Sequence, residues 1–249
     1  MVDQQKKIIV TRFAPSPTGI FHLGSLRTAL FNFLFARSLK GRFLLRIEDT
    51  DLQRSIPAEA ERIEMFLKSF GLFFDSITFQ KERFPIYLHY GNKLVASGLA
   101  YKSSSDKGRS VFFLNVNEFR KRFLLSEISF FDQLRKKEIS FDLKHFGDFV
   151  IIKSDGSPGY NFSVVIDDYL AKVTDVLRGE EHIANMPKQL IIYRSFSFSP
   201  PRYFHLGLLV DAQKKKLSKR SADQTFSISK LMELGFLKEA LLNFVAFLG

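Results

Sequence analysis

Short apolar runs and helically spaced apolar residues alternate over the first fifty positions of the chain. Residues 7 to 14 (KIIVTRFA) are rich in branched side chains and predict a buried strand, which a loop containing Pro and Gly ends. Residues 23 to 39 place apolar side chains at helical spacing, and Gly41 stands where a C-terminal cap is expected. Residues 42 to 47 (RFLLRI) predict a second strand. A strand, a helix and a strand in this order favour a parallel sheet with helical crossovers, which predicts the α/β fold class.

The pattern is less regular in the middle of the chain. Pro57 opens a second predicted helix, but residues 103 to 147 mix polar, Lys-rich and Phe-rich pieces and predict only a small insertion. Order returns at residues 148 to 153 (DFVIIK), a predicted strand followed by a Ser-Asp-Gly turn. We expect a second half of sheet and helix to resume there, and two short helices to end the chain at Gly249.

Composition narrows the class of protein. The chain has 249 residues, of which 45% are hydrophobic, so it can bury a sizeable core. No apolar run is long enough to span a bilayer, and the polar first seven residues resemble no signal peptide, so we expect a cytoplasmic protein without a membrane partner. The sequence contains no Cys, which excludes disulfides and thiolate metal sites.

The charge balance favours a polyanionic partner. Lys and Arg number 37 against 26 Asp and Glu, a formal net charge of +11, and such a field attracts nucleic acid. The same balance also fits a mutational drift toward Lys and Phe codons, since the chain has 29 Phe and no Trp. Charge alone therefore leaves both interpretations open.

The first candidate site is a strand-to-helix junction. Arg12-Phe13-Ala14-Pro15-Ser16-Pro17-Thr18-Gly19 leads into His22-Leu23-Gly24-Ser25. A helix N-terminus attracts phosphate, and Gly24 lets a flat nucleotide approach the backbone. His22 can donate a hydrogen bond to the phosphates, although a His in this place can also simply cap the helix. The segment resembles the nucleotide site of the class I aminoacyl-tRNA synthetases, which implies ATP-binding roles for His22, Gly24 and Ser25.

The second candidate site is the basic segment Lys216-Leu217-Ser218-Lys219-Arg220. It resembles the second class I motif, a mobile loop that closes over the triphosphate. An ammonium group suits that position because negative charge develops on the phosphates during activation. The resemblance implies a catalytic role for Lys219, supported by Lys216, with Ser218 in the ATP site. A solvated run of Lys residues is the alternative.

The ordered set of motifs is similar to the bacterial-type glutamyl-tRNA synthetases. Besides the two segments above, its members are Arg46 to Asp51 (RIEDTD), Tyr160-Asn161-Phe162, Asp167-Asp168 and Arg178 to His182 (RGEEH). The resemblance covers residues 8 to 102 and 148 to 249. It implies a Rossmann-type parallel sheet with a short inserted acceptor-stem-binding subdomain and a C-terminal helical segment. It also implies a need for ATP and Mg²⁺, with the metal accompanying ATP and not held by the protein.

The resemblance divides the chain into four expected segments. Residues 1 to 102 are the first half of the catalytic domain, and residues 103 to 147 are a shortened acceptor-stem-binding insertion. Residues 148 to 220 are the second half with its basic loop, and residues 221 to 249 begin a helical stem-contact segment.

The same resemblance implies a glutamate pocket, whose members carry complementary charges. Two guanidiniums suit the two carboxylates of glutamate, and one carboxylate suits its ammonium group. Arg12 and Arg178 are expected to bind the carboxylates, and Glu48 the ammonium; a surface charge network is the alternative for Asp49 and Asp51. The implied pocket consists of Arg12, Ala14, Ser16, Glu48, Tyr160 and Arg178.

The chain departs from the family pattern in three places, and these departures change which metal and tRNA contacts we expect. Ser103, Ser104 and Ser105 stand where many relatives have a cysteine cluster, so no zinc is expected. The insertion is short, and the sequence given stops where a full enzyme continues into an anticodon-binding domain. We therefore expect a monomer that binds the acceptor end of tRNA, with a separate chain as a conceivable source of anticodon recognition.

Two alternative functions stay open at this point. One is the related enzyme that glutamylates queuosine in tRNA for aspartate, against which the Lys-Leu-Ser-Lys-Arg loop and the Ala-Leu-Leu-Asn-Phe segment weigh. The other is a truncated or non-catalytic tRNA-binding relative, against which His22, Glu48, Arg178 and Lys219 weigh. The favoured prediction is a glutamate-tRNA ligase that forms glutamyl-adenylate and transfers glutamate to the 3′ end of tRNA for glutamate in translation.

Overall fold

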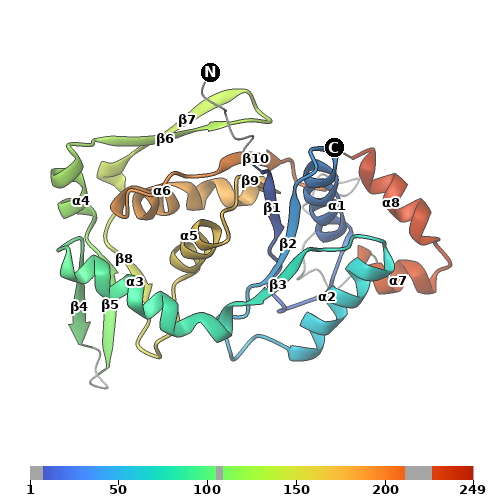
Figure 1. The fold of residues 1–249 in the computed structure, drawn as a ribbon, viewed down its shortest axis with the longest axis horizontal. Helices are drawn as coiled ribbons and strands as arrows, with labels where there is room; N and C mark the ends of the chain where they lie inside the picture. Colours follow the sequence, from blue (N-terminus) through green and yellow to red (C-terminus); the bar gives the residue numbers. More distant parts are fainter. Residues whose placement is uncertain (1–7, 105–108, 211–225, 249) are drawn as a thin grey trace.

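Parallel strands form the centre of the molecule, as the alternating pattern predicts. The computed structural model describes residues 8–104, 109–210 and 226–248 (Figure 1). Strands β1 (Val10–Phe13), β2 (Arg42–Ile47) and β3 (Ser76–Phe79) pair in parallel in the order β1-β2-β3. The predicted strands at residues 7 to 14 and 42 to 47 are therefore confirmed, the first in a shorter form.

A second sheet continues this one on the far side of β1. Its order is β7-β6-β10-β9, built from β6 (Glu127–Asp132), β7 (Lys137–Asp142), β9 (Asp175–Gly179) and β10 (Arg202–Leu206). Strand β10 is parallel to both β9 and β6, whereas β6 and β7 form an antiparallel hairpin. The hairpin comes from the predicted insertion, so part of that segment extends the central sheet.

Backbone and side-chain hydrogen bonds join the two sheets where β1 meets β9. Thr174 N donates to Val10 O over 2.9 Å, and Val10 N donates to Thr174 Oγ1 over 2.8 Å. The buried Asn32 side chain donates from Nδ2 to Leu177 O over 2.9 Å and so fastens the first helix to β9. The strands on the two sides of this junction are thus held as one twisted layer.

Helices cover both faces of this layer. The helix α1 (Leu23–Ser38) matches the predicted helix, and α2 (Pro57–Ser69) begins at the predicted Pro, whose missing N–H costs nothing at a helix start. Both pack their apolar residues against β1 and β2. Helices α5 (Tyr160–Leu170) and α6 (Met186–Ser195) lie together on the opposite face, beside β9 and β10 (Figure 1).

Gly41 takes part in the predicted cap, because its N–H donates to Ala36 O over 2.7 Å, but it is not the left-handed residue. The residue with left-handed backbone at this helix end is Lys40, with φ of 53°. Gly41 is needed for a different reason, because a Cβ there would overlap the carbonyl oxygen of Ile9. The Gly therefore lets β2 start against the segment that enters β1.

A small antiparallel sheet lies at one end of the molecule. Its strands are β4 (Ala100–Ser104), β5 (Ser110–Leu114) and β8 (Phe149–Ile152), packed with α3 (Phe84–Ala96) and α4 (Val116–Phe123) around a separate apolar cluster. The strand predicted at residues 148 to 153 is confirmed as β8. It pairs antiparallel with β5, and the expected second half of sheet and helix follows it as α5, β9, α6 and β10. The division of the chain at residues 102, 147 and 220 stays a prediction.

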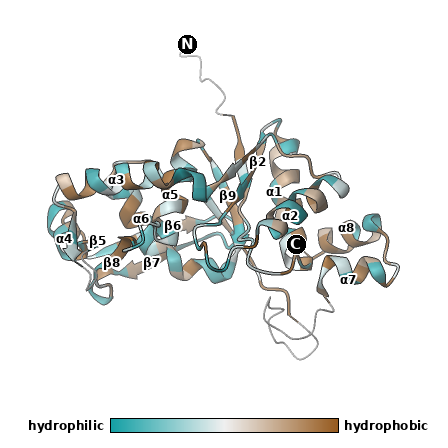
Figure 2. Ribbon diagram, turned by 90° about the horizontal axis from the view of Figure 1, so that it is seen from below, coloured by the Kyte–Doolittle hydropathy of each residue, from teal (hydrophilic) through white to brown (hydrophobic). Residues whose placement is uncertain are grey.

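The chain's last described residues lie at the opposite end (Figures 1 and 2). Helices α7 (Ile228–Glu233) and α8 (Lys238–Ala246) confirm the two short predicted helices, and α8 packs on α1. Three 3-10 helices complete the described elements, η1 (Gln80–Arg83), η2 (Leu143–His145) and η3 (Glu180–Asn185). Helices carry both hydrophilic and hydrophobic stretches in Figure 2, and within the described ranges none has the length and apolarity to cross a membrane.

Candidate active site

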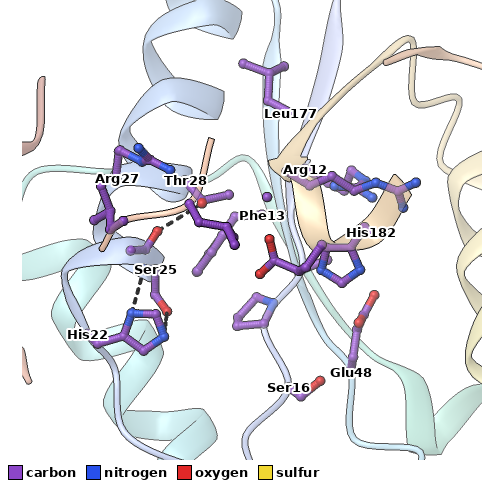
Figure 3. A pocket seen from close by; sticks show the side chains of 18 of the residues that line it. Arg12, Phe13, Ser16, His22, Ser25, Arg27, Thr28, Glu48, Leu177 and His182 are labelled. Atoms are coloured by element: carbon purple, nitrogen blue, oxygen red, sulfur yellow. Dashed lines mark hydrogen bonds between the residues drawn. The ribbon is translucent and has the colours of Figure 1, made fainter. Parts of the chain in front are cut away.

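A cavity of about 430 Å³ opens where the parallel strands end (Figure 3). Its walls come from the carboxyl ends of β1, β2, β9 and β10 and from the first turns of α1 and α5. In open α/β sheets ligands bind outside the carboxyl ends of the strands, at the point where chain connections diverge to opposite faces. The junction of β1 and β9 is such a point, because α1 follows β1 on one face and α6 follows β9 on the other. The cavity is lined by Arg12 to Ser16, His22, Gly24, Ser25, Arg27, Thr28, Glu48, Tyr160, Leu177 to Gly179, Glu181, His182 and Gly207 to Leu209.

One wall of the cavity is the N-terminus of α1. His22 is its N-cap, and the ring Nδ1 accepts from Ser25 N over 3.3 Å. A Cβ on Gly24 would lie 3.0 Å from His22 Cε1, so the absence of a side chain lets the imidazole fold back over the first turn. Figure 3 shows His22 and Ser25 together at this rim. The capping alternative for His22 is therefore confirmed, and the same residue also lines the cavity.

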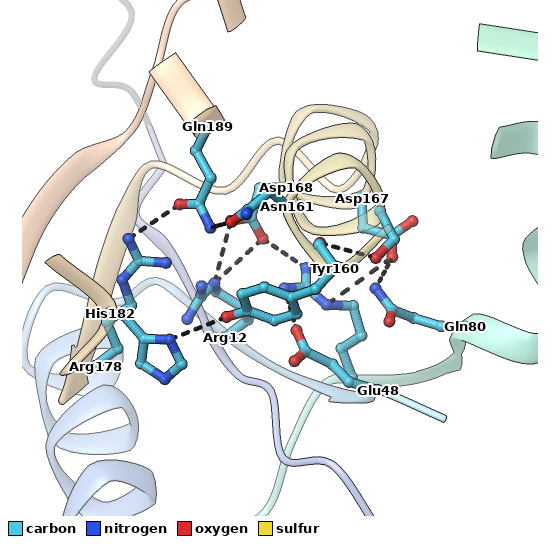
Figure 4. Close-up of polar contacts among 12 residues, drawn as sticks. Arg12, Glu48, Gln80, Tyr160, Asn161, Asp167, Asp168, Arg178, His182 and Gln189 are labelled. Atoms are coloured by element: carbon cyan, nitrogen blue, oxygen red, sulfur yellow. Dashed lines mark hydrogen bonds and ion pairs between the residues drawn. The ribbon is translucent and has the colours of Figure 1, made fainter. Parts of the chain in front are cut away.

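A buried charge network adjoins the cavity through Arg12 and Glu48 (Figure 4). Arg46 Nη1 lies 2.5 Å from Asp168 Oδ1, and its Nη2 donates to Glu48 Oε1 over 3.1 Å. Arg12 Nε donates to Asp168 Oδ1 over 3.2 Å. All four residues are at most 8% exposed. Two guanidiniums thus face two carboxylates, which lets all four charges exist out of water.

The same burial shifts the two carboxyl groups in opposite directions. Burial raises the pKa of Glu48, and the opposing charges of Arg46 and Arg12 do not fully cancel this effect. Burial also acts to raise the pKa of Asp168, but Arg12 and Arg46 outweigh it and leave that pKa lowered. Asp168 is consequently the firm anionic anchor of the network, whereas ionised Glu48 lacks a full set of compensating charges and suits a cationic ligand group.

Three contacts within the protein hold the Arg178 guanidinium. Its Nε donates to His205 Nε2 over 3.3 Å, and its Nη2 donates to Gln189 Oε1 over 3.0 Å. The guanidinium also stands over the Tyr203 ring, 5.4 Å from the centroid. Its Nη1 is buried and has no hydrogen-bond partner among the described residues. A buried donor without a partner costs free energy unless a ligand satisfies it, and Arg178 lines the cavity.

Tyr160 closes the cavity from the side of α5. Its hydroxyl lies 3.2 Å from His182 Nδ1 (Figure 4). Burial, then the nearby Glu48 charge, raises the pKa of Tyr160 to about 12. Burial and the Arg178 charge lower the pKa of His182 to about 4. Both groups are therefore neutral near pH 7 and act there as hydrogen-bonding groups.

Known proteins resemble the chain over nearly its whole length. The family described as tRNA synthetases class I (E and Q), catalytic domain, matches residues 8–109 and 121–249. The chain belongs to this family. Among curated relatives, the glutamate–tRNA ligase of Bacillus subtilis is 41% identical over 278 residues, and glutamate–tRNA ligase 1 of Helicobacter hepaticus is 43% identical over 270 residues. The alignments cover 96% and 97% of this chain but 58% and 57% of those proteins.

Solved structures agree with the family. The crystal structure of a glutamate tRNA ligase from Elizabethkingia meningosepticum, in complex with its amino acid, superposes with a TM-score of 0.85 at 29% identity. It matches 97% of this chain and 61% of that one. The predicted α/β fold of a class I synthetase catalytic domain is thereby confirmed. This chain spans somewhat more than half the length of the relatives it matches.

The structure brings together every predicted site residue that it describes. For a class I synthetase domain the predicted glutamate pocket is Arg12, Ala14, Ser16, Glu48, Tyr160 and Arg178, and all six line the one cavity. His22, Gly24 and Ser25, predicted to bind ATP, line the same cavity. Asp49 and Asp51 do not line it. Asp51 pairs with the exposed Arg54, as a surface charge network predicts, whereas Asp49 is buried and its Oδ1 accepts from Lys81 N over 2.9 Å.

Lys216, Ser218 and Lys219 lie outside the described residues. The segments on either side of residues 211–225 both reach the cavity region. Leu209 lines the cavity, and Ser227 forms a β-bridge with His22 before it caps α7. The described residues on both sides of this segment therefore lie beside the candidate nucleotide site. Its roles stay predictions.

Several supporting residues in this synthetase domain were missed by sequence reasoning. Arg46 and Asp168 stood only as members of motifs, and Gln189, His205 and Asp132 received no role. Asp167 likewise received no role, yet it accepts from Gln80 Nε2, Arg83 Nε and Tyr87 OH over 2.7 to 2.8 Å. A signal existed for Asp167 and Asp168, since two adjacent acidic residues in the apolar helix YNFSVVIDDYL demand buried cationic partners.

Proposed function

We propose that the chain activates L-glutamate with ATP and transfers it to the 3′ end of tRNA for glutamate. The observation that carries this proposal is a cavity lined by Arg12, the incompletely compensated Glu48 and Arg178, whose buried Nη1 has no partner among the described residues. Two cationic groups and one anionic group match the two carboxylates and one ammonium of glutamate. The names of the relatives support the same amino acid.

Each charged group has an assigned partner in this proposal. Arg178 binds one substrate carboxylate through Nη1, and Arg12 binds the other. Glu48 binds the substrate ammonium. The positive charge of the ammonium compensates the buried negative charge of Glu48, which Arg46 and Arg12 balance only in part. Ala14, Ser16 and Tyr160 shape the space between them. A neutral glutamine amide would leave a buried guanidinium donor unpaired, so the site discriminates against it.

Activation joins glutamate to ATP in the neighbouring part of the cavity. A substrate carboxylate oxygen attacks the α-phosphorus, and the bond from that phosphorus to the bridging oxygen of pyrophosphate breaks. The N-terminus of α1, with its helix dipole, and the His22 ring line the part of the cavity where the phosphates would bind. ATP enters as its Mg²⁺ complex, and Lys219 with Lys216 stabilises the charge on the leaving pyrophosphate.

Transfer to tRNA completes the reaction. A hydroxyl of the terminal ribose attacks the activated carbonyl carbon, and AMP leaves with the bonding electrons. The net charge of +11 supports binding of the tRNA backbone. In this proposal residues 103 to 147 contact the acceptor stem, and the domain works as a monomer in cytoplasmic translation.

Exchange of labelled pyrophosphate into ATP, with tRNA present, tests the proposal. We expect exchange with glutamate and at least about hundredfold weaker kcat/KM with glutamine, the order of discrimination that a lost partner for a buried charge produces. Lys219→Ala is expected to lower the exchange rate about hundredfold while glutamate binding stays near normal. Equal exchange with both amino acids would contradict the pocket assignment, and an unchanged Lys219→Ala rate would remove Lys219 from the mechanism.

A further inference from the structure

A buried chain of three side chains runs from the β6-β7 hairpin to Arg178. Asp132 ends β6, His205 lies on β10, and Arg178 lies on β9. His205 Nδ1 lies 2.8 Å from Asp132 Oδ2, and His205 Nε2 accepts from Arg178 Nε over 3.3 Å. The side chains of Asp132 and His205 are 0% exposed. Three neighbouring strands thus supply one member each, with no solvent between them.

The direction of each hydrogen bond follows from the donors present. Asp132 Oδ1 accepts from Leu134 N and Arg135 N, each over 3.0 Å, so the carboxylate is turned with one oxygen to the backbone and one to His205. A carboxylate oxygen can only accept, so the proton of a neutral imidazole stands on Nδ1. Nε2 is then the acceptor that the Arg178 N–H requires. Burial and the Arg178 charge lower the pKa of His205 to about 4, so the ring is neutral near pH 7.

We propose that Asp132 and His205 are positioning residues for substrate recognition, because Asp132 selects the His205 tautomer that holds the Arg178 guanidinium toward the cavity. This inference rests on the proposed function, in which Arg178 binds a carboxylate of glutamate. With Nε held by His205 and Nη2 by Gln189, the guanidinium plane is fixed and Nη1 is presented without a partner. A planar group fixed in this way loses little freedom when it binds a carboxylate.

Asp132→Asn is the sharpest test because it hardly changes the shape of the side chain. The amide oxygen stays with Leu134 N and Arg135 N, since turning the amide would set its N–H₂ against two backbone donors. The amide N–H₂ then faces His205 Nδ1 and forces the proton to Nε2, where it opposes the Arg178 Nε–H. We expect the KM for glutamate to rise about tenfold, the value of one lost hydrogen bond to a charged group, with the KM for ATP unchanged.

Matched variants separate positioning from general damage. Asp51→Asn makes the same substitution outside the cavity and outside residues 103 to 147, where Asp51 pairs with the exposed Arg54, and is expected to leave the KM for glutamate unchanged. His205→Asn keeps a donor toward Asp132 but loses the acceptor for Arg178, whereas His205→Gln can carry its amide oxygen to the Nε2 position. The glutamate KM is therefore expected to be higher in His205→Asn than in His205→Gln. Equal effects of these two variants would contradict the proposal.

A substrate-independent measurement keeps this proposal distinct from the proposed function. Nitrogen NMR of His205 in the free protein is expected to show a proton on Nδ1 in the wild type and on Nε2 in Asp132→Asn. One outcome is that the wild type shows glutamate-dependent pyrophosphate exchange, and that Asp132→Asn changes the His205 tautomer but not the KM for glutamate. The positioning role is then wrong and the proposed function stands. If the wild type shows no glutamate-dependent pyrophosphate exchange, the proposed function fails. A proton on His205 Nε2 in the wild type would by itself refute the positioning role of Asp132 and His205.

Discussion

Arg12 Nε donates to Asp168 Oδ1 over 3.2 Å, although 156 positions separate the two residues in the chain. This contact ties the end of β1 to α5 and is shared by Arg46, whose Nη1 lies 2.5 Å from the same carboxylate oxygen. One buried carboxylate thereby sets the place of a proposed substrate-binding arginine. The pocket depends on residues that do not touch its space.

Asp168→Asn is expected to destabilise the fold strongly. The change leaves Arg12 and Arg46 buried with one fewer anion, and removing one partner of a buried ion pair typically costs about 3 to 5 kcal/mol. Urea unfolding at pH 7 measures this cost. Asp51→Asn is the control, because its partner Arg54 is 71% exposed and little change is expected. Similar losses in both variants would contradict the central role of Asp168.

The cost of Asp168→Asn should also depend on pH in a defined direction. The folded-state pKa of Asp168 is lowered, so its stabilising effect is present above the unfolded pKa of about 3.9 and is lost as pH falls through the folded value. The difference in unfolding free energy between wild type and variant should therefore shrink in acid. A difference that stays constant down to pH 2 would show that lost packing, not charge, causes the destabilisation.

Glu48→Gln is expected to separate stability from binding. The folded-state pKa of Glu48 is raised, so the ionised side chain opposes folding above its unfolded pKa of about 4.3. A neutral Gln can still accept from Arg46 Nη2, while Asp168 continues to pair with Arg46. We expect a melting temperature at pH 7 equal to or above that of the wild type. Titration calorimetry should show glutamate affinity lowered about thirtyfold, because a charged partner of the ammonium is lost.

The outcome of Glu48→Gln discriminates between two roles. A variant that binds glutamate normally would show that Glu48 belongs only to the buried network of Arg46. A variant that is both unstable and inactive would show that Glu48 is chiefly structural. Only preserved stability with weakened binding supports the assigned partner of the ammonium group.

The protein should lose stability as pH falls from about 6.5 to about 4. The pKa of His182 is lowered to about 4 from its usual 6.5, so within this window the unfolded chain binds a proton that the folded chain does not. Each such group adds a slope of about 1.4 kcal/mol per pH unit to the unfolding free energy. His182→Gln should reduce the measured slope by about that amount. His205, whose pKa is also lowered to about 4, still contributes to the slope in this variant. An unchanged slope would show that His182 titrates normally.

Local signals carried the sequence prediction where they were strong. Residues 42 to 47 form β2 as predicted, and α2 begins at Pro57, because an apolar run and a Pro at a helix start act within a few positions. The pocket residues followed from the ordered motifs of a known family. Nothing local indicated that β8 pairs with β5, since strand partners are chosen by contacts across the whole chain.

The supporting residues of the site lay beyond sequence reasoning for a similar reason. His205 stands 73 positions from Asp132, and a buried His and a buried Asp show no sequence feature that names the partner. Gly41 illustrates the same limit at short range. A Gly after a helix suggests a left-handed cap, but its true constraint is the neighbouring Ile9 backbone, which only the folded chain brings close.

Gly24→Ala is expected to weaken ATP use without weakening the fold. In helices Ala is favoured over Gly, by up to about 1 kcal/mol in the interior, so the substitution in the first turn of α1 gives no reason for lost stability. Its Cβ, however, would stand 3.0 Å from His22 Cε1 and 3.1 Å from Nδ1, and the ring must move by a few tenths of an ångström. A misplacement of about 1 Å can cost about a hundredfold in rate, so a smaller shift should raise the KM for ATP by about tenfold. Thermal melting and the ATP dependence of pyrophosphate exchange measure the two effects separately.

Gly147→Ala, at a position where a Cβ meets nothing within 4 Å, is the control and should change neither the melting temperature nor the KM for ATP. A normal KM for ATP in Gly24→Ala would show that the place of the His22 ring is not critical, and a joint loss of stability and activity would show that the new methyl disturbs α1 itself.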